Sequence, residues 1–226
     1  IVMSKQDFLV ELGTEELPPK ALLKLSKSFQ AGVVEGLKKE SLAHGEVKSF
    51  ATPRRLAVLV CALDEQQADR LTQKFGPAVK AAFDTHGNAT RAADGFAKSC
   101  GVLVADLGRA PKDGVEKLSF SSTLPGKSTN ELLPAIVDGA LAKLPIPKRM
   151  RWGASRDEFV RPVHWLVMLF GEEVVPSTIM GVESGADSFG HRFHHPDKIR
   201  IGKPIEYEAL MLEPGNVVAD FAKRRE

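Results

Sequence analysis

Apolar residues form short runs and regular stripes along the first part of the chain. Residues 8–12 are apolar except at position 11, which predicts a short buried strand that turns at residues 13–14. Pro18 and Pro19 follow, where the first turn of a helix tolerates proline. Next, apolar side chains recur at steps of three and four, which predicts an amphipathic helix packed on a sheet. These residues are Leu22, Leu25, Phe29, Val33 and Leu37.

Two further places in the chain predict paired strands. Residues 47–51 and 56–63 are rich in apolar and β-branched residues around a turn at residues 52–54, and their closeness favours an antiparallel pair. Residues 159–171 and 174–182 have the same character and are separated by a glycine turn. The pattern therefore predicts a sheet built mainly from antiparallel neighbours.

The middle of the chain is less regular. Residues 76–83 predict a short helical segment that begins at a Gly-Pro pair. Residues 92–100 predict another short helix, and Gly101 is well suited to cap its C-terminal end. Residues 115–124 indicate a strand or one arm of a hairpin.

The clearest helix signal lies between residues 128 and 144. Ser128 and Glu131 have the spacing of a capping box, in which each side chain satisfies a free backbone amide of the other residue. Pro145 provides the stop. The apolar positions of this predicted helix are Leu132, Leu133, Ile136, Val137, Leu141 and Leu144.

A polar loop at residues 185–196 and a tail from Pro204 complete the pattern. The tail predicts two short helices separated by a Pro-Gly pair at residues 214–215. Strand pairs with helices between them are typical of an α+β fold, here with a mixed, largely antiparallel sheet and flanking helices. We expect one α+β domain over residues 3–203 and the helical start of a following region over residues 204–226.

Composition restricts the class of protein. The chain has 226 residues, of which 43% are hydrophobic and 27% charged, as in a globular protein. Its two cysteines cannot form a disulfide framework, and acidic residues interrupt any apolar run at the N-terminus, so we expect a cytoplasmic protein with no membrane partner. Met3 is expected to be the native start. The charged, helix-friendly stretch at residues 216–226 has no glycine or proline stop, as in a chain cut inside a helix, so we expect a fragment.

The formal net charge of +2 is too small to indicate a polyanionic partner, so attraction must come from local clusters. Residues 145–165 hold five Lys or Arg and two acidic residues. Such a cluster can neutralise phosphates, and a tryptophan within it offers a face for a base. The candidates here are Lys148, Arg149, Arg151, Trp152, Arg156, Arg161 and His164, with Gly153 in the same segment. The alternative is a charged surface loop in which the tryptophan covers core.

Arg54 and Arg55 form a weaker basic point at a tight turn, from which both guanidinium groups are expected to project freely. The loop at residues 190–196 carries three imidazoles, His191, His194 and His195, together with Arg192. A metal site is one reading of this loop, although Arg192 would repel a cation. A polar loop with solvated histidines and an RNA contact through its basic side chains are the other two.

Signatures of self-contained catalysis are missing from the sequence. There is no GxxxxGK[ST] or GxGxxG loop, no HExxH and no GxSxG. Glu15 and Glu16 are adjacent carboxylates at a predicted helix start, where the positive end of the helix dipole explains them without catalysis. We therefore predict no catalytic residue and no metal in this chain.

Several segments of the chain are long and distinctive enough to be compared with known families. The most specific is the opening run FLVELGTEELPP at residues 8–19. The others follow in order over almost the whole chain. They are TPRRLA at 52–57, GPA at 76–78, AFD at 82–84, LPIPKRMRWG at 144–153, FVRPVHW at 159–165 and GHRF at 190–193. Together these segments resemble one family, the β subunit of bacterial heterotetrameric glycine–tRNA ligase. The histidines at 194 and 195 are not expected from this resemblance.

The resemblance implies an ATP-dependent enzyme of two α and two β subunits that attaches glycine to tRNA(Gly). The α subunit would carry the active site with its ATP and magnesium, and this chain would lack cofactors and be inactive alone. Its role would be to support tRNA binding and subunit assembly. A purely structural or protein-interaction module is the alternative, and a small hydrolase using the histidines of residues 191–195 is a third hypothesis.

Overall fold

The computed structural model describes residues 4–152 and 157–225, so Met3, Gly153 and Arg156 lie outside the described residues. Contacts divide the chain into two compact units, one formed by residues 1–67 with 127–226 and the other by residues 68–126. The second unit is inserted between two segments of the first. The predicted boundary at residues 203–204 divides the chain differently and stays a prediction.

The first unit is built on a mixed sheet whose long neighbours are antiparallel. Its strands follow the order β11-β12-β9-β1-β3-β2, and β10 also pairs with β9. Among the strand pairings of the described residues, only that of β12 with β9 is parallel. The strands are β1 (Lys5–Thr14), β2 (Val47–Thr52), β3 (Arg55–Asp64), β9 (Val163–Phe170), β10 (Glu173–Val174), β11 (Thr178–Ile179) and β12 (Val182–Gly185). The expected α+β class with a mixed, largely antiparallel sheet is confirmed.

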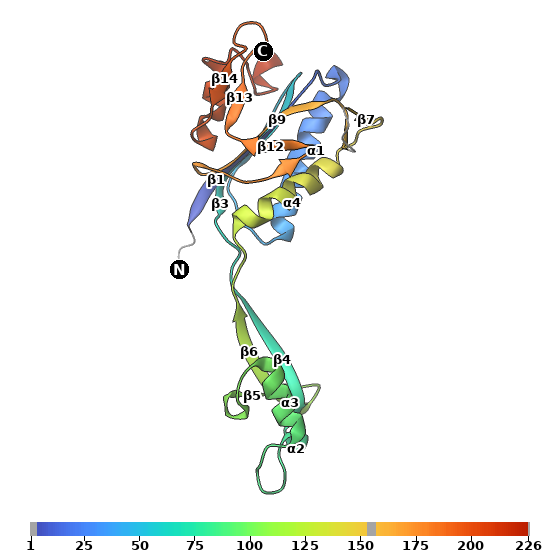
Figure 1. Ribbon diagram of the computed structural model, residues 1–226, viewed down its shortest axis with the longest axis vertical. Helices are drawn as coiled ribbons and strands as arrows, with labels where there is room; N and C mark the ends of the chain where they lie inside the picture. Colours follow the sequence, from blue (N-terminus) through green and yellow to red (C-terminus); the bar gives the residue numbers. More distant parts are fainter. Residues whose placement is uncertain (1–3, 153–156, 226) are drawn as a thin grey trace. The chain divides into compact units, whose positions relative to one another are not determined.

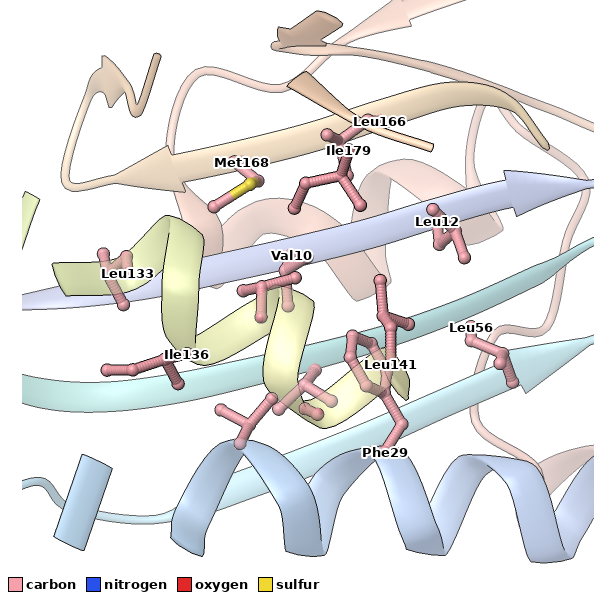
Figure 2. Packing of buried hydrophobic residues seen from close by; sticks show 14 of the residues in the cluster. Val10, Leu12, Phe29, Leu56, Leu133, Ile136, Leu141, Leu166, Met168 and Ile179 are labelled. Carbon is pink, nitrogen blue, oxygen red and sulfur yellow. The ribbon is translucent and has the colours of Figure 1, made fainter. Parts of the chain in front are cut away.

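Two long helices, α1 (Pro19–Lys39) and α4 (Thr129–Ala142), lie side by side on one face of this sheet (Figure 1). Alternate residues of β1 point to them, so Val10 and Leu12 are buried in one cluster with Phe29 of α1 and Leu141 of α4 (Figure 2). Alternation along a strand sends successive side chains to opposite faces. β1 is buried on both faces and supplies two cores.

The opposite face is covered by the C-terminal part of the chain. Leu9, Leu59 and Trp165 of the sheet pack there against Ile199 and Tyr207. The covering elements are β13 (Asp187–Phe189), β14 (Lys198–Arg200), the 3-10 turn η2 (Pro204–Glu206) and α5 (Tyr207–Leu212), and the 3-10 turn η3 (Lys223–Arg225) follows near the end of the chain. A small hairpin, β7 (Met150–Arg151) with β8 (Glu158–Phe159), completes the described part of this unit.

The second unit is a three-stranded antiparallel sheet of order β4-β6-β5 with short helices. Its elements are β4 (Arg70–Ala78), α2 (Val79–Ala82), α3 (Arg91–Cys100), the 3-10 turn η1 (Val104–Asp106), β5 (Gly108–Lys112) and β6 (Val115–Leu124). Its buried core consists of Ala82, Ala93 and Leu118 with partly buried neighbours. Gly101 caps α3 in the left-handed conformation with φ 72°, as predicted.

Several sequence predictions need correction. The predicted helix at 76–83 is reduced to α2, because residues 76–78 are the end of β4, where Ala78 pairs with Lys117 of β6. The predicted strand at 174–182 is divided among β10, β11 and the start of β12. Ser128 is the N-cap of α4, but its side chain makes no capping hydrogen bond. The second helix predicted in the tail is only the turn η3.

Candidate nucleic-acid interface at one end of the main sheet

Three segments that are far apart in sequence meet where β1 ends. Because β1 is antiparallel to both β3 and β9, its last residues lie beside the first residues of each neighbour. Backbone hydrogen bonds continue this pairing into the following loop. The Thr14 amide donates to the Arg54 carbonyl at 2.8 Å, the Glu15 amide to that of Pro162 at 3.0 Å, and the Leu17 amide to that of Pro53 at 2.6 Å.

Two pockets open at this end of the sheet. The sheet-end pocket has a volume of about 390 Å³, and Arg54, Arg55, His191, Arg192, Phe193 and Arg224 line it among others. The tryptophan pocket has a volume of about 260 Å³ and is lined in part by Arg54, His164, Trp165, Phe189 and Arg192. Arg54 and Arg192 belong to both, so the two hollows share a cationic boundary.

A buried carboxylate underlies these pockets. Glu11 is fully buried in β1, on the face that turns toward the C-terminal segment. Its Oε2 accepts a hydrogen bond from Arg55 Nη1 at 3.2 Å, and its Oε1 accepts one from Trp165 Nε1 at 2.5 Å. The hydroxyl groups of Ser188 and Tyr207 also donate to this carboxylate. These four donors, from four different segments, therefore replace the water molecules that would solvate an exposed carboxylate.

Arg55 connects the carboxylate to the histidine-bearing loop. Its side chain is 2% exposed, and its Nη2 donates to the Phe189 carbonyl at 2.7 Å, one residue before the loop begins at Gly190. Burial alone lowers the pKa of Arg55, but the interaction with the Glu11 carboxylate outweighs burial and raises this pKa above its ordinary value. The expectation that Arg55 projects freely from the turn is therefore wrong, because Glu11 requires a buried counter-charge.

Arg54 belongs to the same turn but is less buried than Arg55. It is partly buried, and its guanidinium carbon lies 5.8 Å from the centre of the Trp165 ring. The Nε atoms of both Arg54 and Arg55 are buried and have no hydrogen-bond partner within the described part of the chain. Most buried donors in proteins have acceptors, so these two atoms need an explanation.

Tyr207 has the most strongly perturbed titration in this cluster. The pKa of its phenol is raised well above the ordinary value. Complete burial is the largest cause, and the negative charge of Glu11 is the second. The ring also packs against Phe50, with ring centres 5.2 Å apart. The hydroxyl group is thus held as a neutral donor to the carboxylate.

Tyr207 is the single tyrosine of the chain, so phenolate absorbance reports on it alone. We expect the native protein to show no phenolate until the pH is well above about 10, whereas the urea-unfolded chain titrates near that value. Because the folded pKa is raised, the stability that this shift contributes is complete below the unfolded pKa and is lost as the pH rises through the folded pKa. Identical native and unfolded titration curves would contradict the burial of this phenol.

The loop after β13 presents aromatic and basic side chains together. Phe193 is 81% exposed, and the guanidinium carbon of Arg192 lies 5.9 Å from its ring centre. The His191 Nδ1 accepts hydrogen bonds from the amides of Phe193 and His194, at 3.2 and 3.3 Å. No three potential ligand side chains are grouped closely enough to hold a metal ion in residues 4–152 and 157–225.

Two more of the predicted residues bind the loop that follows β1. The Nε2 of His164 lies 3.0 Å from the Glu15 carboxylate, and the Nε of Arg161 donates to the Glu16 carbonyl at 2.9 Å. Glu15 therefore has a local partner in addition to its place before α1. His164 also lines the tryptophan pocket.

The remaining described basic residues of this segment lie in the β7–β8 hairpin or just before it, and two of them have internal partners. Arg149 donates to the carbonyls of Ala142 and Glu158, at 3.0 and 3.5 Å, and Arg151 forms an ion pair with Glu158 at 2.6 Å. Trp152 is partly buried against the main core, as the alternative reading expected. Lys148 lines a different, apolar pocket with Arg161.

The structure thus gathers Arg54, Arg55, His164, His191 and Arg192 around two adjoining pockets. The candidates of the β7–β8 hairpin lie outside the lining of these two pockets. RNA contact by any of them stays a prediction. Sequence reasoning did not select Phe193 or Arg224, although a phenylalanine inside a Gly-His-Arg loop could have drawn attention to the first.

Sequence comparison identifies the family. A sequence model described as Glycyl-tRNA synthetase beta subunit matches residues 8–226, which places the chain among the components of aminoacyl-tRNA synthetases. The chain belongs to the glycyl-tRNA synthetase beta subunit family, so the resemblance seen in its motifs is confirmed. The matched region is the N-terminal part of that subunit.

Individual relatives agree with this assignment. The chain is 51% identical to the glycine–tRNA ligase beta subunit of Marinobacter nauticus and 54% identical to those of Pseudomonas entomophila and Pseudomonas aeruginosa. Each alignment covers 99% of this chain and 32% of the relative. The chain therefore spans about a third of the length of these relatives. None of the described helices is both long enough and apolar enough to cross a membrane.

Proposed function

We propose that this chain serves glycine–tRNA ligase as a non-catalytic part of its β subunit, where it supports tRNA binding and subunit assembly. Its partners are then the α subunit and tRNA(Gly), in a cytoplasmic complex of two α and two β subunits. ATP and magnesium are used by the α subunit, and this chain alone is inactive. The cationic end of the main sheet is the part that contacts RNA.

The observation that carries the RNA contact is the grouping of unneutralised cations around the pockets. Neither Arg54 nor Arg192 has a carboxylate within 4.0 Å among the residues that the structure describes. Arginine suits this role because its planar fork matches phosphate oxygens in pairs. With a net charge of only +2, the chain attracts a polyanion through such a local grouping.

A salt series of tRNA binding tests the proposal. We expect an Arg54→Ala/Arg192→Ala variant to bind tRNA about tenfold more weakly than the wild type, with a salt slope smaller by roughly two, because two phosphate contacts are lost. The matched control is Arg151→Ala, which removes an exposed arginine already paired with Glu158. Equal affinity and an unchanged slope in the double variant would contradict an RNA role for this end of the sheet.

The structural alternative is favoured by the β7–β8 hairpin, where Arg149 and Arg151 have partners inside the fold. Co-purification of the full β subunit with the α subunit separates the two readings. Loss of assembly in an Arg149→Ala/Arg151→Ala variant, with tRNA binding retained by the Arg54→Ala/Arg192→Ala variant, supports a protein-interaction module in place of RNA binding.

A further inference from the structure

We propose that the sheet-end pocket and the tryptophan pocket together hold one unpaired nucleotide, with its phosphate at Arg54 and Arg192 and its base on an exposed aromatic ring. This inference rests on the proposed function, because it names the part of an RNA that the cationic end of the sheet selects. The same chemistry would also be supplied by a free mononucleotide.

The charge of the pocket lining selects an anion. Four cationic or imidazole-bearing side chains are accessible in the sheet-end pocket, whereas Glu16 is its single carboxylate among the described residues. The four are Arg54, His191, Arg192 and Arg224. Arg224 is committed in part, since its Nη1 donates to the Val218 carbonyl at 2.9 Å. Arg54 and Arg192 line both pockets and keep their charge available.

Unsatisfied donors point to the same ligand. The Nε atoms of Arg54 and Arg55 are buried without an acceptor in the described part of the chain, and both residues line the sheet-end pocket. Arg55 itself is 98% buried, being 2% exposed. A buried donor without an acceptor is destabilising, and an acceptor oxygen bound beside it removes that cost. A phosphate group presents several such oxygens at once.

Aromatic surfaces stand beside these cations. Phe193 lines the sheet-end pocket with 81% of its surface exposed, which is unusual for so large an apolar side chain. The tryptophan pocket is walled by Trp165 and Phe189, whose ring centres are 5.0 Å apart. Because every base has a flat π face, an exposed ring next to a guanidinium group is a stacking platform that tolerates any sequence.

The dimensions favour a single unpaired nucleotide. The sheet-end pocket, with about 390 Å³, is large enough for one small ligand. The adjoining tryptophan pocket, with about 260 Å³, can hold a further part of the same ligand. Bases inside a duplex are stacked on their neighbours and cannot reach an aromatic wall. Unpaired nucleotides in loops, bulges and ends can be splayed out and stacked on side chains, which is how proteins usually read single-stranded RNA.

The Phe193→Ala variant tests base stacking separately from the phosphate contacts of the arginines. The probes are a fluorescently labelled single-stranded RNA oligonucleotide and the blunt duplex made from it, measured by polarisation with the 226-residue chain. We expect the variant to bind the single strand about tenfold more weakly and the duplex as well as wild type, with the salt slope unchanged for both. Leu103→Ala is the control, since it removes another apolar side chain that is 73% exposed.

Unchanged affinity of Phe193→Ala for the single strand overturns the nucleotide pocket. If the Arg54→Ala/Arg192→Ala variant still loses tRNA affinity in that case, the proposed function stands without this inference. Displacement of the single strand by AMP supports the pocket. Binding of AMP that depends on Arg192, together with tRNA binding that does not, assigns the pocket to a free nucleotide and removes the RNA role instead.

Discussion

Replacement of Glu11 by alanine is expected to lower the free energy of unfolding by about 3–5 kcal/mol, because it leaves the Arg55 guanidinium buried without its counter-charge. Ser188, Trp165 and Tyr207 lose their acceptor in the same step. Urea denaturation followed by tryptophan fluorescence measures the loss. Both tryptophans of the chain, Trp152 and Trp165, lie in the unit that contains Glu11.

Glu15→Ala is the matched control for the Glu11 variant. Glu15 is a carboxylate from the same segment, but its side chain is 41% exposed, and its side-chain partner within residues 4–152 and 157–225 is His164. Exposed pairs of this kind contribute about 0–1 kcal/mol. A Glu11→Ala variant that loses no more stability than this control would show that the carboxylate is not a buried anchor.

Replacement of Gly13 by alanine is expected to lower the free energy of unfolding by about 2–4 kcal/mol. A Cβ atom at this position would lie 1.9 Å from ring atoms of Trp165, so the indole would have to move. The indole is buried and donates to Glu11, so its movement also breaks the hydrogen bond of Nε1. The same urea and fluorescence measurement reports the change.

Gly139→Ala is the control for Gly13→Ala, because the same substitution at this position is expected to stabilise the protein. Gly139 lies inside α4, and a Cβ atom there would meet nothing within 4 Å. We expect this variant to be more stable by about 0.5–1 kcal/mol, because alanine favours the helix and glycine does not. Equal effects of the two substitutions would mean that close packing on Trp165 does not determine the residue at position 13.

The inserted unit explains why domain organisation was difficult to predict. Residues 68–126 have a small buried core, whose cluster consists of Ala82, Ala93 and Leu118. Periodicity in sequence reflects burial, so a unit with so small a core gives a weak pattern. Residues 76–78 illustrate this, because their Gly-Pro pair indicated a helix start, whereas they form the end of β4 and Ala78 pairs with Lys117 of β6.

The structure brings together only part of the residues that were predicted as contacts, and contact itself stays a prediction. Arg54, His191 and Arg192 were selected from local sequence, and they line one pocket because β1, β3 and the loop after β13 meet there. Arg55 was selected for the same local reason but turns inward to Glu11. Its partner Glu11 is 44 residues away in sequence, so no local motif could have indicated this pairing.

Some features of this protein follow from the order of its residues alone. The long helices, the strands of the main sheet, the cap at Gly101 and the family itself depend on local periodicity or on contiguous motifs, which need no knowledge of distant contacts. Tertiary structure decided which cations stay exposed, which are buried and which motifs are neighbours. Those outcomes depend on desolvation and strand pairing between distant segments, and both exist only after the chain has folded.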